Sequence, residues 1–238
     1  MSLLEIKDIY AGYNDTTVLQ GVTAEVDEGD IVCFIGPNGA GKSTMFRCIY
    51  NLLTLSEGDI RFKGESIVGL SQAELLSLGI GYVFQRNAIF EKMSVRENLE
   101  MGAYIKGRNF DLEKRLEEVY NVFPLLRERS DDRAGTFSGG QRQMLEFGRG
   151  LMIKPDLLLL DEPTAGLAPK IIDQVFEQVE EINSMGVTIV MIEQNIKSGL
   201  KHADYVYVLE NGQTVFSGPA STILDEPEIR SAYLGDNT

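Results

Sequence analysis

One eight-residue segment constrains the fold of this chain more than any other feature. It reads Gly36-Pro37-Asn38-Gly39-Ala40-Gly41-Lys42-Ser43. The short apolar run of residues 31–35 before it predicts a buried strand, and residues 44–53 after it, which contain no Gly or Pro, predict a helix. A strand, a glycine-rich turn and a helix N-terminus in this order predict a phosphate-binding P-loop.

The residue types of this segment suit a chain of phosphates. Glycines let backbone N–H groups approach the phosphates, and the helix dipole favours negative charge there. We expect Lys42 to reach the β- and γ-phosphates and the Ser43 hydroxyl to bind Mg²⁺. The alternative is a tight turn that carries Lys-Ser by chance. The expected nucleotide-binding residues here are Gly36, Pro37, Asn38, Gly39, Ala40, Gly41, Lys42, Ser43 and Thr44.

Length and composition restrict the possible classes of protein. The chain has 238 residues, of which 43% are apolar, enough for one α/β domain with a real core. Its net charge of −14 argues against a surface built to bind nucleic acid. Cys33 and Cys48 lie in the predicted strand and helix and give neither a disulfide framework nor a metal spacing, so we expect a reducing, cytosolic compartment. Residues 1–7 do not resemble a signal peptide, and no apolar run approaches the roughly 18 residues of a spanning helix.

The pattern along the chain predicts two kinds of structure. Short strands broken by turns are expected over residues 3–34, with further strands over 59–63 and 79–84. A helical insertion begins near the capping box of Ser94 and Glu97 and continues with an amphipathic helix over residues 111–123, whose charged faces we expect to be solvated.

After the insertion, strands and helices alternate again. The predicted elements are strands over 157–160 and 187–192, a helix over 170–185 and a hairpin closed by Asn211-Gly212. This alternation predicts a largely parallel sheet.

Two further segments carry chemistry of the kind that phosphates need. Asp161 and Glu162 follow an apolar strand, at the edge where open α/β sheets bind ligands, so Asp161 is expected to help hold Mg²⁺ and Glu162 to accept a proton from the attacking water. Taken alone, they could be two solvated acids. Ser138 precedes Gly139-Gly140-Gln141 and is expected to cap a helix from Arg142 to Met152, which makes a second anion site or an ordinary cap.

Together, the P-loop, Gln85, residues 137–141 and Asp161-Glu162 resemble the ATP-binding-cassette (ABC) ATPase family over essentially the whole chain. The resemblance implies a P-loop NTPase fold, with an α/β core of residues 1–85 and 151–238 that includes an antiparallel β subdomain, and a helical subdomain of residues 86–150. It implies that Tyr13 stacks on adenine, although Tyr13 could also be a strand-edge tyrosine. It further implies that Gln85 touches Mg²⁺ and the lytic water. Residues Ser138, Gly139, Gly140 and Gln141 would bind ATP held by a second subunit.

Two positions depart from the family pattern. Gln194 stands where a histidine is usual, and it can donate a hydrogen bond to the γ-phosphate but cannot carry a proton charge. Ala168 stands where a carboxylate is usual. His202, the only histidine, is read as structural. Several segments are similar to the ATP-binding subunits of branched-chain amino acid importers, whereas residues 84–87 fit that subgroup less well. The similar segments are 123–129, 140–145, 166–169, 193–195 and 232–235.

The sequence therefore predicts an ATPase that binds ATP and Mg²⁺ and drives an ABC transporter, with branched-chain amino acids as the expected solute. The resemblance implies a second ATPase subunit, membrane permease subunits, an indirect extracytoplasmic solute-binding protein, and a peripheral location on the cytoplasmic face of the membrane. Three alternatives remain open: another cargo, such as urea, amides, lipid or lipopolysaccharide; an ABC ATPase acting on nucleic acid; and a regulatory cassette that binds ATP without turnover.

Overall fold

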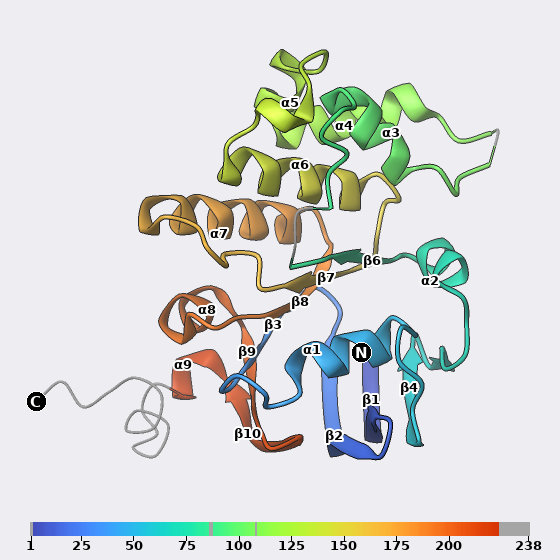
Figure 1. Ribbon diagram of the computed structural model, residues 1–238, viewed down its shortest axis with the longest axis vertical. Helices are drawn as coiled ribbons and strands as arrows, with labels where there is room; N and C mark the ends of the chain where they lie inside the picture. The colour runs from blue at the N-terminus through green and yellow to red at the C-terminus, as the bar shows by residue number, and fades with distance from the viewer. Residues whose placement is uncertain (1, 86–87, 108, 224–238) are drawn as a thin grey trace, which may run out of the picture. The chain divides into compact units, whose positions relative to one another are not determined.

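The computed structural model describes residues 2–85, 88–107 and 109–223, and Figure 1 traces their helices and strands. The chain divides into two compact units. Unit 1 comprises residues 1–72 and 188–238, and unit 2 comprises residues 73–187. The expected α/β class, with an antiparallel β region beside parallel strands, is confirmed.

An antiparallel sheet occupies the N-terminal part of unit 1. Its strands follow the order β2-β1-β4-β5 and have these bounds: β1 (Ser2–Tyr13), β2 (Thr16–Asp27), β4 (Glu57–Phe62) and β5 (Glu65–Ser66). The expectation of strands broken by turns is confirmed, but β1 and β2 are longer than expected, at 12 residues each. Register shifts such as the one between Ile6 and Ile9 interrupt the alternation of apolar residues without ending the strand.

The parallel strands of unit 1 carry the P-loop. β3 (Ile31–Ile35) pairs in parallel with β8 (Thr188–Ile192) and with β9 (Tyr205–Glu210). Every residue of β3 and β8 is buried, which explains their continuous apolar runs. β9 turns into antiparallel β10 (Gln213–Pro219) at Asn211 and Gly212, whose φ values of 47° and 77° confirm the predicted tight hairpin.

The helices of unit 1 are α1 (Lys42–Ile49), α8 (Ile196–His202) and α9 (Ala220–Ile223). The helix expected to reach residue 53 ends four residues earlier. Asn51 has a left-handed φ of 50°, and its side-chain amide donates to the carbonyls of Ile67 and Leu70 at 2.6 and 3.0 Å. An asparagine in this conformation directly after the C-cap is a common end of a helix, and the two hydrogen bonds anchor its side chain to a segment 16 to 19 positions later.

Unit 2 contains two parallel strands and a set of helices. β6 (Ile80–Val83) pairs with β7 (Leu157–Asp161), so that Val83 lies opposite Leu160. The helices are α2 (Gln72–Leu78), α3 (Val95–Gly102), α4 (Leu112–Val122), α5 (Pro124–Glu128), the 3₁₀ turn η1 (Ala134–Thr136), α6 (Gly139–Leu151) and α7 (Pro169–Ser184). Within this unit α6 lies between α3 and α4 on one side and α7 on the other (Figure 1).

Two features of the helical region follow from the sequence and one does not. The Ser94 capping box is confirmed: Ser94 Oγ accepts from the Glu97 N–H at 3.1 Å, and Glu97 accepts from the Ser94 N–H at 2.7 Å. The apolar face of α4 buries Leu116 and leaves Leu112 half-buried. However, Arg115 is also buried and donates to the carbonyl of Leu151 at 3.0 Å, so the expectation that the charged residues of this helix are solvated is wrong for Arg115.

The helix over residues 169–184 carries the expected inward face, with Ile172 only half-buried. Cys33 and Cys48 are both buried and unpaired, as expected of small core residues. Across the described ranges, no helix combines the length and the apolar character needed to cross a bilayer.

Candidate nucleotide-binding and catalytic residues

In unit 1 the P-loop connects β3 to α1 through a backbone that only glycine adopts easily. Gly36, Gly39 and Gly41 have φ values of 147°, 85° and 103°. A Cβ atom on Gly36 would lie 2.1 Å from the carbonyl oxygen of Leu209, whereas one on Gly39 would meet nothing within 4 Å. The loop is therefore closed against the protein at Gly36 and open at Gly39, where a ligand can approach its backbone.

Lys42 is the first residue of α1, and its side chain is only 5% exposed. Its ammonium group donates to the carbonyls of Gly36 at 2.7 Å and Pro37 at 3.0 Å. Ser43 and Thr44 follow in the first helical turn, whose N–H groups have no partner within the helix. A buried ammonium group beside these N–H groups fits a polyanion such as a triphosphate.

Tyr13 ends β1 and is 38% exposed. Arg47 of α1 donates to the Tyr13 hydroxyl at 3.0 Å, and its guanidinium lies 6.0 Å from the centre of the ring. The tyrosine therefore has a partly exposed aromatic ring and a hydroxyl held by Arg47.

Gln194 follows β8 and is exposed. The next residue, Asn195, caps α8 by accepting from the Ser198 N–H at 3.2 Å. His202 is the last residue of α8, as expected of a histidine at a helix end.

In unit 2 the expected acidic residues stand at the end of a buried strand. Asp161 is the last residue of β7, is 7% exposed, and accepts a hydrogen bond from the Tyr82 hydroxyl at 3.0 Å. Glu162 is equally buried, and the Gln85 amide donates to its carboxylate. The structure thus brings Gln85, Asp161 and Glu162 into one part of unit 2, although Gln85 and Glu162 are 77 positions apart in the chain.

Glu162 has a φ of 52°, a left-handed backbone conformation that costs about 1 kcal/mol or more for a residue other than glycine. Strained backbone of this kind concentrates at functional sites, where the surrounding structure holds it in place. The conformation directs the chain away from β7 immediately after Asp161.

The segment Ser138–Gln141, which we call the signature segment, starts α6. The helix begins at Gly139, three residues earlier than expected, and Gln141 accepts from the Ser138 N–H at 3.0 Å. A Cβ atom on Gly140 would lie 2.7 Å from a methyl group of Ile171 in α7. This glycine therefore permits a close approach of two helices besides leaving the helix start open. Ala168 is the N-cap residue of α7 and offers no carboxylate.

Two segments that bear on the subgroup, one that fits it and one that fits it less well, cannot be fully placed. Residues 86 and 87 of the 84–87 segment and residues 232–235 of the tail lie outside the described residues. Among the residues that are described, no group of three or more His, Cys, Asp or Glu side chains is arranged to hold a metal ion. Oxygen ligands of the kind that Mg²⁺ prefers are the Ser43 hydroxyl in unit 1 and, in unit 2, the Gln85 amide and the Asp161 carboxylate.

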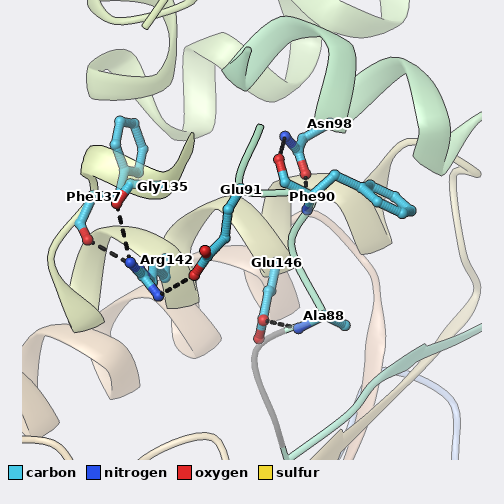
Figure 2. A network of polar contacts seen from close by, with 8 residues as sticks. All are labelled: Ala88, Phe90, Glu91, Asn98, Gly135, Phe137, Arg142 and Glu146. Atoms are coloured by element: carbon cyan, nitrogen blue, oxygen red, sulfur yellow. Dashed lines mark hydrogen bonds and ion pairs between the residues drawn. The ribbon is translucent and has the colours of Figure 1, made fainter. Parts of the chain in front are cut away.

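Sequence reasoning missed three buried or half-buried polar residues in unit 2: Asn98, Glu146 and Arg149. Asn98 is fully buried, and Glu146 is 3% exposed. Both hold the backbone of residues 88–91, as Figure 2 shows. The available signal was a glutamate between Leu145 and Phe147 on the apolar face of a predicted helix, where an apolar residue would be usual.

The comparisons with known proteins agree on one family. The family model described as "ABC transporter" matches residues 19–165. The chain is 42% identical to the high-affinity branched-chain amino acid transport ATP-binding protein BraG of Pseudomonas aeruginosa, across 98% of this chain and 100% of BraG. It is 33% identical to the probable branched-chain amino acid transport ATP-binding protein LivF of Archaeoglobus fulgidus, across 98% and 99% of the two chains.

Among solved structures, the ADP conformation of MJ1267, an ATP-binding cassette of an ABC transporter, is similar with a TM-score of 0.87. It is 32% identical to this chain and is matched over 99% of this chain and 100% of its own.

Proposed function

Because the chain belongs to the ABC transporter family of ATP-binding proteins, we propose that this ATPase drives the import of branched-chain amino acids. The similarity to BraG and LivF extends over nearly the whole length of all three chains, and both relatives are named for branched-chain amino acid transport. For the chemistry, the observation that carries the proposal is the hydrogen bond from Gln85 to Glu162, beside Asp161 at the end of a buried strand.

The P-loop supplies the phosphate site in this proposal. Its backbone N–H groups and the Lys42 ammonium group bind the phosphates of ATP, and Tyr13 stacks on the adenine. Ser43, Gln85 and Asp161 are the residues that would hold Mg²⁺, which when bound neutralises charge on the β- and γ-phosphates.

Glu162 accepts the proton of the attacking water, and Gln85 orients that water. Gln194 donates a neutral hydrogen bond to the γ-phosphate, so proton transfer at this position is not part of the mechanism. Ala168 adds no carboxylate, which leaves Glu162 as the base of the reaction.

The signature segment binds ATP held by a second ATPase subunit, so that two chains close on two nucleotides. In this proposal residues 86–150 form a helical subdomain that transmits the motion to membrane permease subunits, and residues 1–85 and 151–238 form the catalytic core. The chain then works at the cytoplasmic face of the membrane, with an extracytoplasmic binding protein delivering the solute and no role for nucleic acid.

Reconstituted transport tests the proposal. Proteoliposomes that contain the chain with its co-purified permease subunits and binding protein should take up leucine, isoleucine and valine in proportion to ATP hydrolysed. Uptake of urea or an amide instead, or export of lipid, would overturn the solute. Absence of ATP turnover in the wild-type complex would overturn the whole assignment.

The Glu162→Gln variant is the matched negative control, because it keeps the size of the side chain but cannot accept a proton. We expect ATP affinity to stay within about twofold while kcat falls at least about a hundredfold, the usual contribution of a general base. Unchanged turnover in this variant would contradict the role of Glu162.

A further inference from the structure

The backbone polar groups of Ala88 and Phe90 are held by side chains from the helices of unit 2. Glu146 accepts from the N–H of Ala88 at 2.7 Å, and Arg149 donates to the carbonyl of the same residue. Glu146 and Arg149 are one turn apart on α6, so they reach Ala88 from the same face of that helix. Both backbone polar groups of Ala88 are therefore held by α6.

The backbone of Phe90 is held in the same way, and Glu91 is held through its side chain, as Figure 2 shows. Asn98 of α3 accepts from the N–H of Phe90 at 2.8 Å and donates to its carbonyl at 3.0 Å. Arg142 of α6 pairs with the Glu91 carboxylate at 3.0 Å, and it also donates to the carbonyls of Gly135 and Phe137 at 3.1 and 3.0 Å. We call this set of contacts the loop clasp.

The loop clasp contains a buried acid whose ionised form is costly. Burial raises the pKa of Glu146 to about 6, although the hydrogen bond from Ala88 and the charges of Arg149 and Arg142 lower it. Burial also lowers the pKa of Arg149. An apolar side chain between Leu145 and Phe147 would avoid this cost, so the fold keeps a buried acid and a neighbouring arginine where packing alone does not require them.

Ala88 stands three positions after Gln85, whose amide donates to Glu162. Only residues 86 and 87, which lie outside the described residues, separate them in the chain. A hydrogen bond to a catalytic carboxylate depends on sub-ångström placement of the donor. Fixing the chain at Ala88 limits where Gln85 can go.

We propose that Glu146 and Arg149 are positioning residues for ATP hydrolysis, which hold Ala88 so that Gln85 is aligned with Glu162. This inference rests on the proposed roles of Gln85 and Glu162. It gives α6 two tasks: its first turn carries the signature segment, and its third turn holds the segment that follows Gln85.

Three variants test the proposal in the full complex. Glu146→Ala removes the acceptor, and we expect kcat for ATP to fall about tenfold while the Kd for ATP stays within twofold, because the P-loop is untouched. Glu146→Gln keeps an acceptor oxygen of the same size and should restore most of kcat. Glu117→Ala is the matched control: Glu117 forms an exposed ion pair with Arg127 in the same unit, and its loss should change neither value.

Two readouts separate positioning from mere support of the fold. In the Gln85→Ala background, Glu146→Ala should cause no further loss of kcat, because both act through one hydrogen bond. The Gln85→Asn variant, which keeps the amide but shortens its reach to Glu162, should likewise show no further loss of kcat when Glu146→Ala is added.

Equal kcat in wild type and Glu146→Ala, or fully additive losses with Gln85→Ala, would overturn the positioning role. In either case an inactive Glu162→Gln variant would leave the proposed function standing. An active Glu162→Gln variant would instead remove the premise on which the positioning role depends.

Discussion

At the scale of single residues, the acids of unit 2 differ in the donors that the fold places beside them. Asp161 and Glu162 are each 7% exposed and accept hydrogen bonds from Tyr82 and Gln85. Glu146 is more buried still, and desolvation dominates its titration. The same residue type therefore serves different purposes according to the donors that the tertiary structure provides.

The raised pKa of Glu146 predicts a pH dependence of stability. A carboxyl group with a folded pKa of about 6 and an ordinary value of 4.5 contributes stability that is present below pH 4.5 and lost as pH rises through 6. Glu146→Gln should therefore gain stability over wild type as pH rises. We expect the difference in free energy of unfolding to widen by about 1 kcal/mol between pH 5.5 and 7.5.

Urea unfolding at several pH values measures this difference. For Glu117→Gln, at an exposed position, the difference in free energy of unfolding from wild type should stay constant with pH. If the difference for Glu146→Gln also stayed constant with pH, the raised pKa of Glu146 would be contradicted.

At the scale of elements, close backbone contacts decide how strands and helices join. The β9–β10 hairpin brings Gly212 against β2: its N–H donates to the carbonyl of Ala40 at 3.0 Å, and its carbonyl accepts from Gln20 at 2.8 Å. The turn therefore links the hairpin to both the P-loop and the antiparallel sheet of unit 1.

Gly212→Ala tests this link. The residue has a φ of 77°, and an added Cβ would lie 1.8 Å from the carbonyl oxygen of Val18. Gly64 has a similar φ of 82° with nothing within 4 Å of an added Cβ, so Gly64→Ala isolates the cost of backbone conformation alone. We expect the free energy of unfolding to fall by about 1 kcal/mol in Gly64→Ala and by about 2 kcal/mol more in Gly212→Ala, as measured by thermal or urea unfolding. Equal losses of unfolding free energy in the two variants would show that the turn at Gly212 accommodates the added Cβ without further strain.

At the scale of the whole molecule, one chain carries one P-loop and one signature segment. The proposed function therefore requires two chains for each pair of complete sites. Glu162→Gln should bind ATP without turnover and accumulate as this dimer, which size-exclusion chromatography with light scattering detects as a doubled mass when Mg-ATP is present. ADP should leave it monomeric.

A Glu162→Gln variant that also carries Ser138→Arg should remain monomeric with ATP, because a long cation at the signature segment blocks its approach to the second subunit. A heterodimer with a paralogue would appear as dimerisation only after that paralogue is added. Dimers that form equally without nucleotide would contradict the proposal.

The amino-acid sequence by itself determined the features that depend on neighbouring residues. The P-loop between its strand and helix, the Ser94 capping box and the Asn211-Gly212 hairpin all lie within short segments, where backbone geometry and local hydrogen bonds select the structure. The apolar run before Asp161 likewise predicts a buried strand from its own composition.

Only the tertiary structure decided which distant residues meet. Asn51 donates to the carbonyl of Ile67, buried Arg115 donates to the carbonyl of Leu151, and Gln85 donates to Glu162. These partners are between 16 and 77 positions apart. The local pattern of apolar and polar residues does not predict such contacts, because burial and hydrogen bonding of a polar side chain depend on what the fold brings beside it.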